Sequence, residues 1–413
     1  MNSRERLLRA IDRGKPDHVP LWCPSFGFEA PAHLRWRRDG VERRFWYSMR
    51  LEHDHTIPQG WDHEDDFHRV QRWFGLGVDD ILEFAPPWSL HPDVTVRDWR
   101  EDPAGDERYP LLCRAYDTPA GTLEHVVRQT DEALAPGWVV PPDHVALFED
   151  FNVGRAKRHG VLGSDDLPKL RYLLQEPTAA QRATYAERVG RVRAFAQREG
   201  VLTQGWSAFG FDGIVDLCGV EGAVMLAMTE PDVFGELVET MSAFDRRRTT
   251  HMLEVGGADV VVAYGWYASV NFWSPKLLRR YLLPWLQGLA ALAHQAGARF
   301  AYVMTQGALP LADLLLEAGI DVLYFVDDVQ DTADLSQVRE RFAGRMAVAG
   351  GVNAGVTLAR GSAAEVRQAT IRAVKTLGPA GGYILAPVDA LFPDTPWTSV
   401  EAMIGAWKEA QGL

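Results

Sequence analysis

GGYILAPVDALFPDTP, residues 381–396, joins a short apolar run to a loop rich in proline and aspartate. The run at residues 383–386 predicts a buried strand. Asp389 lies in the loop that follows it. In α/β enzymes, the reacting groups lie in loops that follow the carboxyl ends of parallel strands. The stretch therefore predicts the last strand of a parallel sheet, with a candidate site residue directly after it.

The same unit, an apolar strand beside an amphipathic helix, repeats upstream of residue 381. We expect strands at 201–207, 258–264, 300–304, 322–326, 346–349 and 382–386, and helices at 231–255, 274–296, 309–318, 335–342, 363–377 and 398–410. Near-continuous apolar strands are typical of a parallel sheet that is covered on both faces. The repetition predicts the α/β class and favours a (β/α)8 TIM barrel over an open sheet.

The remaining barrel strands are expected at residues 19–24 and 80–84, after an amphipathic helix at residues 4–13. Between residues 94 and 128, short alternating segments separated by turn residues indicate an antiparallel β meander. We expect its strands at 94–99, 112–116 and 122–128. Residues 1–413 are therefore predicted to form a single barrel domain that carries a small insert at about residues 90–130.

The formal net charge of −13 over 413 residues argues against nucleic acid or an anionic membrane as a partner. Cys23, Cys113 and Cys218 lie far apart, as is typical of reduced thiols in a cytoplasmic protein. No apolar leader follows Met1, and no apolar run approaches the roughly 20 residues of a membrane span. We expect a cytoplasmic protein that acts on a small molecule, and we include a homodimer among its expected partners.

Several short motifs together resemble the uroporphyrinogen decarboxylase superfamily over nearly the whole chain. They are SRER at 3–6, PDHVP at 16–20, GGVN at 350–353, GYIL at 382–385 and PDTP at 393–396. The superfamily contains porphyrinogen decarboxylases, and zinc-dependent methyltransferases that serve corrinoid proteins or thiols. The resemblance implies a (β/α)8 barrel with its site at the carboxyl ends of the strands.

The chain departs from the zinc methyltransferases at their metal ligands. In those proteins the strand that resembles residues 300–306 carries a His-x-Cys pair, and a cysteine follows the last strand. The resemblance places Tyr302, Met304 and Asp389 at these positions. A zinc site of this kind needs thiolate or imidazole ligands. We therefore expect no zinc and no other cofactor, although Asp389 would suit a harder, oxygen-rich site.

The chain also departs from the porphyrinogen decarboxylases, in which an arginine-rich loop after the first strand grips the substrate carboxylates. The corresponding loop here, PSFGFEAP at 24–31, has no arginine and one glutamate. Such a loop offers no bidentate grip on a substrate with many carboxylates. The resemblance is therefore to the superfamily and not to a true porphyrinogen decarboxylase.

Aromatic residues crowd the chain after the expected strand 258–264. Their rings would suit an aromatic substrate or a methylated cation, while packing between barrel and helices is the competing interpretation. Thr305, Gln306 and Asn353 follow other strands and offer hydrogen bonds to a substrate or to helix ends. The remaining candidates for substrate binding are Trp22, Phe26, Tyr264, Trp266, Asn271 and Trp273.

Carboxylates also follow the expected strands. Asp327 and Asp328 are neighbours, so only one should face inward. Asp212 either acts at the site or caps a helix. The candidate catalytic residues are Asp212, Tyr267, Asp327 and Asp389. The charged stretch with EHDH at 52–55 and HEDD at 63–66 resembles a metal site, but its composition favours a solvated loop or lid.

Three functions follow from these residues. The first is a metal-free acid–base lyase of decarboxylase type that acts on a small aromatic or cationic substrate. The alternative is a methyltransferase that demethylates a methyl ether or quaternary amine and passes the methyl group to a corrinoid protein or another acceptor. The third, a non-catalytic binding barrel, ranks last because packing does not require the polar groups at the rim.

Overall fold

The computed structural model describes residues 1–43, 45, 63–131, 143, 145–331 and 333–413. Its central feature is a parallel sheet with the strand order β13-β12-β11-β10-β9-β8-β3. Within this sheet, each strand lies beside the strand that precedes or follows it in sequence order, as a repeated βα unit requires. The strands are β3 (Ile81–Phe84), β8 (Leu202–Ala208), β9 (Val260–Ala263), β10 (Arg299–Val303), β11 (Val322–Val326), β12 (Ala347–Asn353) and β13 (Tyr383–Val388).

Leu21 and Trp22 close this sheet into a barrel. The Trp22 amide donates to the Leu385 carbonyl at 2.9 Å, and the Asp79 amide donates to the Leu21 carbonyl at 2.8 Å. The segment thus bridges β13 and the residues that lead into β3. It pairs only briefly because Pro20 and Pro24 on either side lack amide donors. The predicted (β/α)8 barrel is confirmed, with its first strand shorter than expected.

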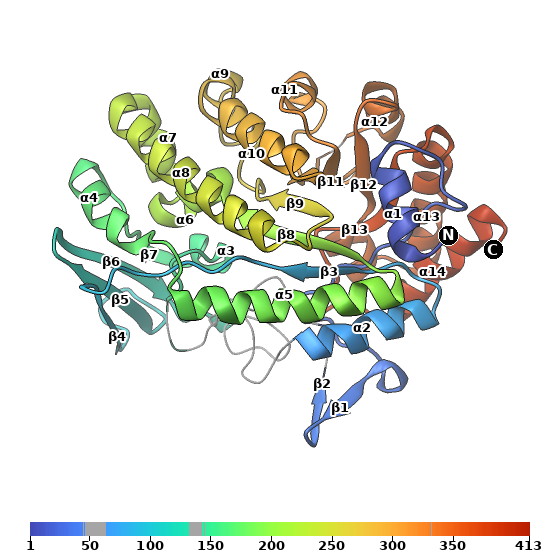
Figure 1. The fold of residues 1–413 in the computed structure, drawn as a ribbon, viewed down its shortest axis with the longest axis horizontal. Coiled ribbons are helices and arrows are strands. Elements are labelled where there is room, and N and C mark those ends of the chain that lie inside the picture. Colours follow the sequence, from blue (N-terminus) through green and yellow to red (C-terminus); the bar gives the residue numbers. More distant parts are fainter. Residues whose placement is uncertain (44, 46–62, 132–142, 144, 332) are drawn as a thin grey trace.

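Helices wrap the outside of the barrel (Figure 1). They are α2 (His63–Gly75), α5 (Ala179–Glu199), α6 (Gly210–Cys218), α7 (Val220–Thr229), α8 (Pro231–Val255), α9 (Pro275–Leu277), α10 (Leu283–Gln295), α11 (Ala312–Glu317), α12 (Leu335–Phe342), α13 (Ala363–Leu377) and α14 (Trp397–Gln411). A π-helical turn, Leu278–Leu282, joins α9 to α10. Within the described residues, no helix combines the length and the apolar character that a membrane span requires.

Side chains alternate between the barrel lumen and the helix layer along the strands, except on β11, where Tyr324 and Phe325 both belong to the lumen cluster. On β9, for example, Val260 and Val262 pack inside the barrel, whereas Val261 and Ala263 pack against the helices. The alternation follows from the two-residue repeat of a pleated strand. It separates the core into a lumen cluster and an outer cluster, so the register of each strand determines which residues meet a ligand.

Helix α1 (Ser3–Ile11) plugs the amino-terminal end of the barrel. Leu7, Ala10 and Ile11 are fully buried in the lumen cluster. Two ion pairs tie the plug to the starts of strands, Arg4 with Asp259 at 2.6 Å and Asp12 with Arg299 at 2.9 Å. The plug leaves the carboxyl ends of the strands as the mouth of the barrel.

An antiparallel sheet interrupts the barrel between β3 and α5. Its strands are β4 (Thr95–Glu101), β5 (Leu111–Thr118), β6 (Gly121–Arg128) and β7 (Ala156–Arg158), in sequence order. The predicted meander is therefore confirmed, and it gains β7, which was too short to be recognised by its pattern. Short helices α3 (Asp150–Val153) and α4 (Leu167–Leu170) follow. Figure 1 shows this sheet at the end of the molecule remote from α1.

The plug should contribute measurably to stability. We expect Leu7→Ala to lower the free energy of unfolding by about 2 to 5 kcal/mol, because it leaves a cavity beneath the lumen cluster. Leu8→Ala, at a half-buried position on the same helix, is the matched control and should cost less. Urea denaturation measures both changes. Equal losses in the two variants would contradict the assignment of α1 as a plug.

Candidate functional site

Glu83 places a carboxyl group inside the barrel near the carboxyl end of β3. It is 4% exposed and lies between Ile81 and Ala85, which both face the lumen. Gln204 Nε2 donates to Glu83 Oε1 at 2.5 Å, and Trp206 Nε1 donates to the same oxygen at 3.1 Å. Burial raises the pKa of Glu83 to about 7. A carboxyl group with such a pKa can both give and take a proton near neutral pH.

Charged groups behind β3 moderate this effect. Arg69 on α2 favours the ionised form of Glu83, and Asp80 opposes it. Arg69 Nη1 itself forms an ion pair with Asp80 at 2.7 Å. Inside the barrel, the Tyr324 hydroxyl donates to Gln204 Oε1 at 3.2 Å, which orients the amide so that its nitrogen faces Glu83. The carboxyl group is therefore held by a connected network.

Aromatic rings stand beside Glu83 at the mouth. The ring centroids of Trp206 and Tyr264 are 5.0 Å apart, and those of Tyr264 and Trp266 are 5.2 Å apart. Trp206 and Trp266 are parallel within 1° at 5.9 Å. Trp22 also faces the lumen, with its ring 5.2 Å from that of Tyr324. The lumen therefore combines aromatic faces with a carboxyl group, an arrangement that suits an aromatic ring or an organic cation.

Asp212 holds the loop that carries these rings. Its two carboxylate oxygens accept hydrogen bonds from the backbone amides of Trp266 at 2.8 Å and Tyr267 at 3.0 Å. The residue lies in the first turn of α6, and it is buried. Asp212 therefore anchors the loop through its carboxylate. Tyr267 belongs to the same loop, and its carbonyl accepts a hydrogen bond from Trp273 Nε1 at 2.8 Å.

Trp273 lies in the outer layer. It is buried, and its ring packs against Phe211 on α6 at 4.9 Å and against Phe234 on α8 at 5.7 Å. Both partners belong to the outer cluster and not to the lumen. Trp273 therefore packs the helix layer and does not line the lumen.

The other polar candidates at the mouth join neighbouring loops. Asn353 Nδ2 donates to Asp327 Oδ2 at 2.7 Å, and Asp327 also accepts from the Val329 amide at 2.9 Å. Burial raises the pKa of Asp327. Asn271 Nδ2 donates to Gln306 Oε1 at 2.5 Å. These side chains therefore tie one βα loop to the next.

Two further residues complete this rim. Asp328 forms an ion pair with Arg372 on α13 at 2.5 Å, while Asp327 is fully buried. Of the two neighbours, Asp328 thus points outward, as the alternation predicts. Thr305, the second residue after β10, is half-buried at the mouth.

Asp389 stands at the rim in a rare backbone conformation. Its φ of 76° lies in the left-handed region, and Val388 before it faces the lumen. Aspartate tolerates this region better than most residues, and such outliers cluster at functional sites. Next to it, the Phe26 amide donates to the Leu391 carbonyl at 2.8 Å. The Phe26 ring stacks on Phe151 of α3 at 5.5 Å, which brings the insert to this side of the mouth.

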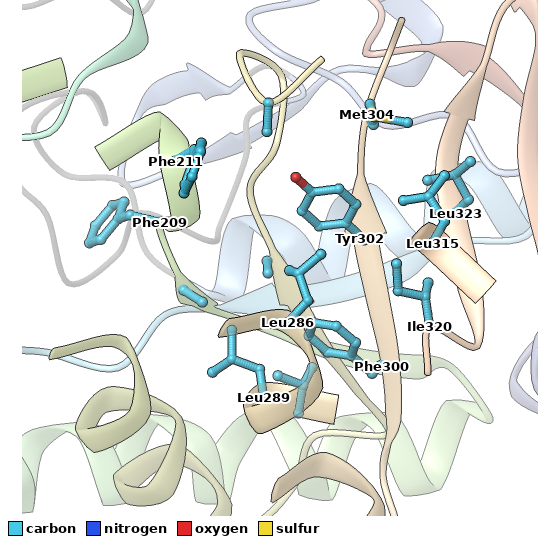
Figure 2. Packing of buried hydrophobic residues seen from close by; sticks show 14 of the residues in the cluster. Phe209, Phe211, Leu286, Leu289, Phe300, Tyr302, Met304, Leu315, Ile320 and Leu323 are labelled. Atoms are coloured by element: carbon cyan, nitrogen blue, oxygen red, sulfur yellow. The ribbon is translucent and has the colours of Figure 1, made fainter. Parts of the chain in front are cut away.

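The register of β10 differs from the one that the resemblance implied. Tyr302 and Met304 point into the outer cluster, and Figure 2 shows Tyr302 near Leu286 of α10. The lumen-facing residues of this strand are Ala301 and Val303. Neither carries a metal ligand, so β10 does not fit a thiolate–imidazole zinc site. No group of three or more His, Cys, Asp or Glu residues that could hold a metal occurs in the described part of the chain.

The charged stretch before β3 is only partly described. EHDH at 52–55 lies outside the described residues. Within α2, Asp65 Oδ1 accepts a hydrogen bond from Trp36 Nε1 at 2.9 Å, and Asp66 lies 3.4 Å from Arg69 Nε. Both carboxylates are buried within a helix, so HEDD at 63–66 is not the solvated loop or lid that its composition favoured.

Glu83 was not among the candidate residues that the sequence motifs predicted. The signal was a charged residue inside an otherwise apolar strand, ILEF, where burial demands a partner. Gln204 and Trp206, which both carry an N–H donor, lie on the neighbouring strand β8, where Gln204 is the register partner of Glu83.

Comparison with known proteins supports the fold. Residues 210–410 match the family described as Uroporphyrinogen decarboxylase (URO-D). A methyltransferase structure from Methanosarcina mazei aligns with a TM-score of 0.58 and 16% identity, over 99% of each chain. D-psicose 3-epimerase from Clostridium cellulolyticum H10 aligns with a TM-score of 0.35 and 10% identity, over 60% of this chain and 92% of that one. No curated protein matches. The resemblance to the superfamily is confirmed over residues 210–410.

The raised pKa of Glu83 predicts a pH-dependent stability. The pKa of Glu83 is 4.5 in its ordinary state and about 7 in the folded protein. Between these two pH values the folded state binds more protons than the unfolded state, so stability falls as pH rises from about 4.5 to about 7. Glu83→Gln does not titrate. Its stability relative to the wild type should rise by up to about 3 kcal/mol between pH 5 and pH 8. Urea denaturation across this range measures the gap, with exposed Glu187→Gln as the control. Parallel curves for Glu83→Gln and wild type would disprove the shift.

Because Asp389 has a positive φ, variants can test its backbone conformation separately from its charge. Asn tolerates the left-handed region, so Asp389→Asn should keep the stability of the wild type. Asp389→Ala should be less stable than Asp389→Gly by about 1 kcal/mol, because a Cβ is strained at positive φ. Thermal unfolding of the three variants checks the order. If alanine and glycine were equal, the strained conformation would not persist in solution.

Proposed function

We propose that this uroporphyrinogen decarboxylase-like barrel is a methyltransferase that binds a small aromatic methyl ether in its lumen, with Glu83 as the general acid. The observation that carries the proposal is a buried carboxyl group with a pKa of about 7, held beside parallel tryptophan rings. The rings would stack on an aromatic substrate, and the acid would lie at its polar end.

The reaction balances with one proton. The electron pair of the acceptor attacks the methyl carbon, the carbon–oxygen bond breaks with its electrons on oxygen, and Glu83 donates its proton to that oxygen. Solvent then reprotonates Glu83. The acceptor that we propose is a corrinoid protein or a thiol. A quaternary amine would leave without a proton, and ionised Glu83 would serve only as its counter-charge.

The other mouth residues would position this substrate. Asp212 would hold Trp266 over the lumen, and the loop ties through Asp327 and Asn353 would keep the rim rigid. Asp389 is the remaining candidate for direct contact with substrate. We propose that the reaction uses no zinc, because β10 offers the lumen neither thiolate nor imidazole. The likeness to the methyltransferase from Methanosarcina mazei supports the fold on which this proposal rests.

The second candidate is a lyase of decarboxylase type. In that reaction the carbon–carbon bond to the carboxylate breaks, carbon dioxide leaves, and Glu83 protonates the carbon that retains the electron pair. The same pKa near 7 favours it. It ranks second because a substrate carboxylate beside Glu83 would be repelled once Glu83 ionised.

A panel of ¹³C-methyl donors tests both candidates. Purified enzyme is offered aromatic methyl ethers, quaternary amines and aromatic carboxylates, with cob(I)alamin or a thiol as acceptor, and products are followed by ¹³C NMR. We expect methyl transfer from an ether, and a loss of about 10² to 10⁴ in its rate in Glu83→Gln. Transfer from an amine needs no proton and serves as the internal control. Carbon dioxide release without methyl transfer would overturn the first candidate in favour of the second.

Metal analysis of the same preparation belongs to this experiment. Stoichiometric zinc in the active enzyme, with loss of turnover on chelation, would overturn the zinc-free part of the proposal. The role of Glu83 would still be decided by the rate of Glu83→Gln.

A further inference from the structure

Arg248 is a buried cation on α8, behind the carboxyl ends of β3 and β8. It is 3% exposed. Its Nη1 donates to the Ser207 carbonyl at 2.7 Å, and its Nη2 donates to the Pro86 carbonyl at 3.1 Å. Ser207 directly follows Trp206, and Pro86 lies three residues after Glu83. One guanidinium group therefore spans the two strands whose side chains meet in the lumen.

Aromatic rings make this buried charge tolerable. The guanidinium carbon lies 4.5 Å from the ring centroid of Phe209, 5.2 Å from that of Trp88 and 5.5 Å from that of Phe244. Cation–π contacts of this kind offset part of the desolvation cost. Burial lowers the pKa of Arg248 to about 10. Because this value is still well above 7, the group remains charged at neutral pH. A lysine would not reproduce the arrangement, because its single ammonium lacks the planar fork.

Two neighbours on α8 fix the same turn. Asp245 accepts hydrogen bonds from the Phe209 amide at 3.1 Å and from the Gly210 amide at 2.9 Å. Thr249 Oγ1 and Ser207 Oγ are 2.8 Å apart. One side of α8 thus holds the end of β8 from Ser207 to the start of α6, immediately after Trp206.

We infer that Arg248 is a positioning residue for the site: it holds the end of β8 against the end of β3 so that Trp206 donates to Glu83. The inference rests on the proposed function of Glu83 as the acid. β3 and β8 pair directly as far as Phe84 and Gly205. Without the two carbonyl contacts of Arg248, the backbone beyond that pairing loses its shared anchor, and the indole leaves Oε1. The Trp206 hydrogen bond favours ionised Glu83, so its loss should raise the pKa of Glu83.

The test uses the full chain labelled with ¹⁵N-indole tryptophan. Trp206→Phe assigns the Trp206 indole cross-peak, which reports its contact with Glu83, and a titration from pH 5 to pH 9 gives the pKa of Glu83. Arg248→Met keeps the length of the side chain and removes both donors. We expect its Trp206 cross-peak to move at fixed pH, and the transition to rise by about one pH unit.

Phe244→Leu is the matched control. It removes an aromatic contact of Arg248 and leaves both carbonyl contacts in place, so it should lower the melting temperature without moving the Trp206 cross-peak or its titration. A residue that only stabilised the fold would give the same result in Arg248→Met. An unmoved cross-peak and an unchanged titration in Arg248→Met would therefore overturn the inference.

Two further outcomes are distinguishable. If Arg248→Met does not fold, Arg248→Lys retains the charge, and it should move the cross-peak in the same direction by a smaller amount. A wild-type position in Arg248→Lys would then overturn the inference. If the wild type shows no transition between pH 5 and pH 9, the proposed function of Glu83 fails, while the cross-peak at fixed pH still decides the role of Arg248.

Discussion

Backbone hydrogen bonds on either side of Leu21 and Trp22 hold the barrel closed, and the rest of the structure depends on them. They join β13 to the residues before β3, the first and last strands of the sheet. A closed parallel sheet has one inner face, so closure assigns every strand residue to the lumen or to the helix layer. α1 then seals one end, and chemistry is confined to the other.

Hydrogen-bond partners divide the polar residues of that open end into two groups. Asp212 accepts bonds from backbone amides, and Asp327 accepts them from two backbone amides and from Asn353, which suits carboxylates that shape loops. Glu83 accepts bonds from side chains in the lumen, where burial favours its protonated form. Asp212 and Asp327 shape the loops of the mouth, whereas Glu83 places in the lumen a carboxyl group that can change its protonation state near neutral pH. The distinction follows from local contacts, since all three residues are buried acids near strand ends.

The geometry of Glu83 in turn depends on elements outside the lumen. Trp206 on β8 donates to Glu83 on the paired strand β3, and Arg248 on α8 binds the backbone carbonyls just beyond the paired parts of both strands. The aromatic layer around Arg248 thus serves both stability and the site. A helix on the outside of the barrel can therefore influence the acidity of a group inside it.

The periodicity of apolar runs was sufficient to predict the barrel, its order of elements and the inserted meander, because each βα unit carries its own pattern of strand, helix and cap. The motifs around Gly351 and Asp389 were sufficient to predict the resemblance that the family model finds over residues 210–410. The site was predicted less well. Tyr264, Trp266 and Trp22 meet the lumen, whereas Tyr302, Met304 and Trp273 face the helices, and Glu83 was not considered.

The reason lies in the burial of these strands on both faces. A strand that is apolar throughout shows no alternation of polar and apolar residues, so its sequence does not tell which alternate residues face the lumen. By itself, the sequence determined where the strands and loops lie and which families they resemble. Only the tertiary structure decided which side of each strand is inside, because closure of the barrel and the seating of α1 set that choice through contacts between residues far apart in the chain.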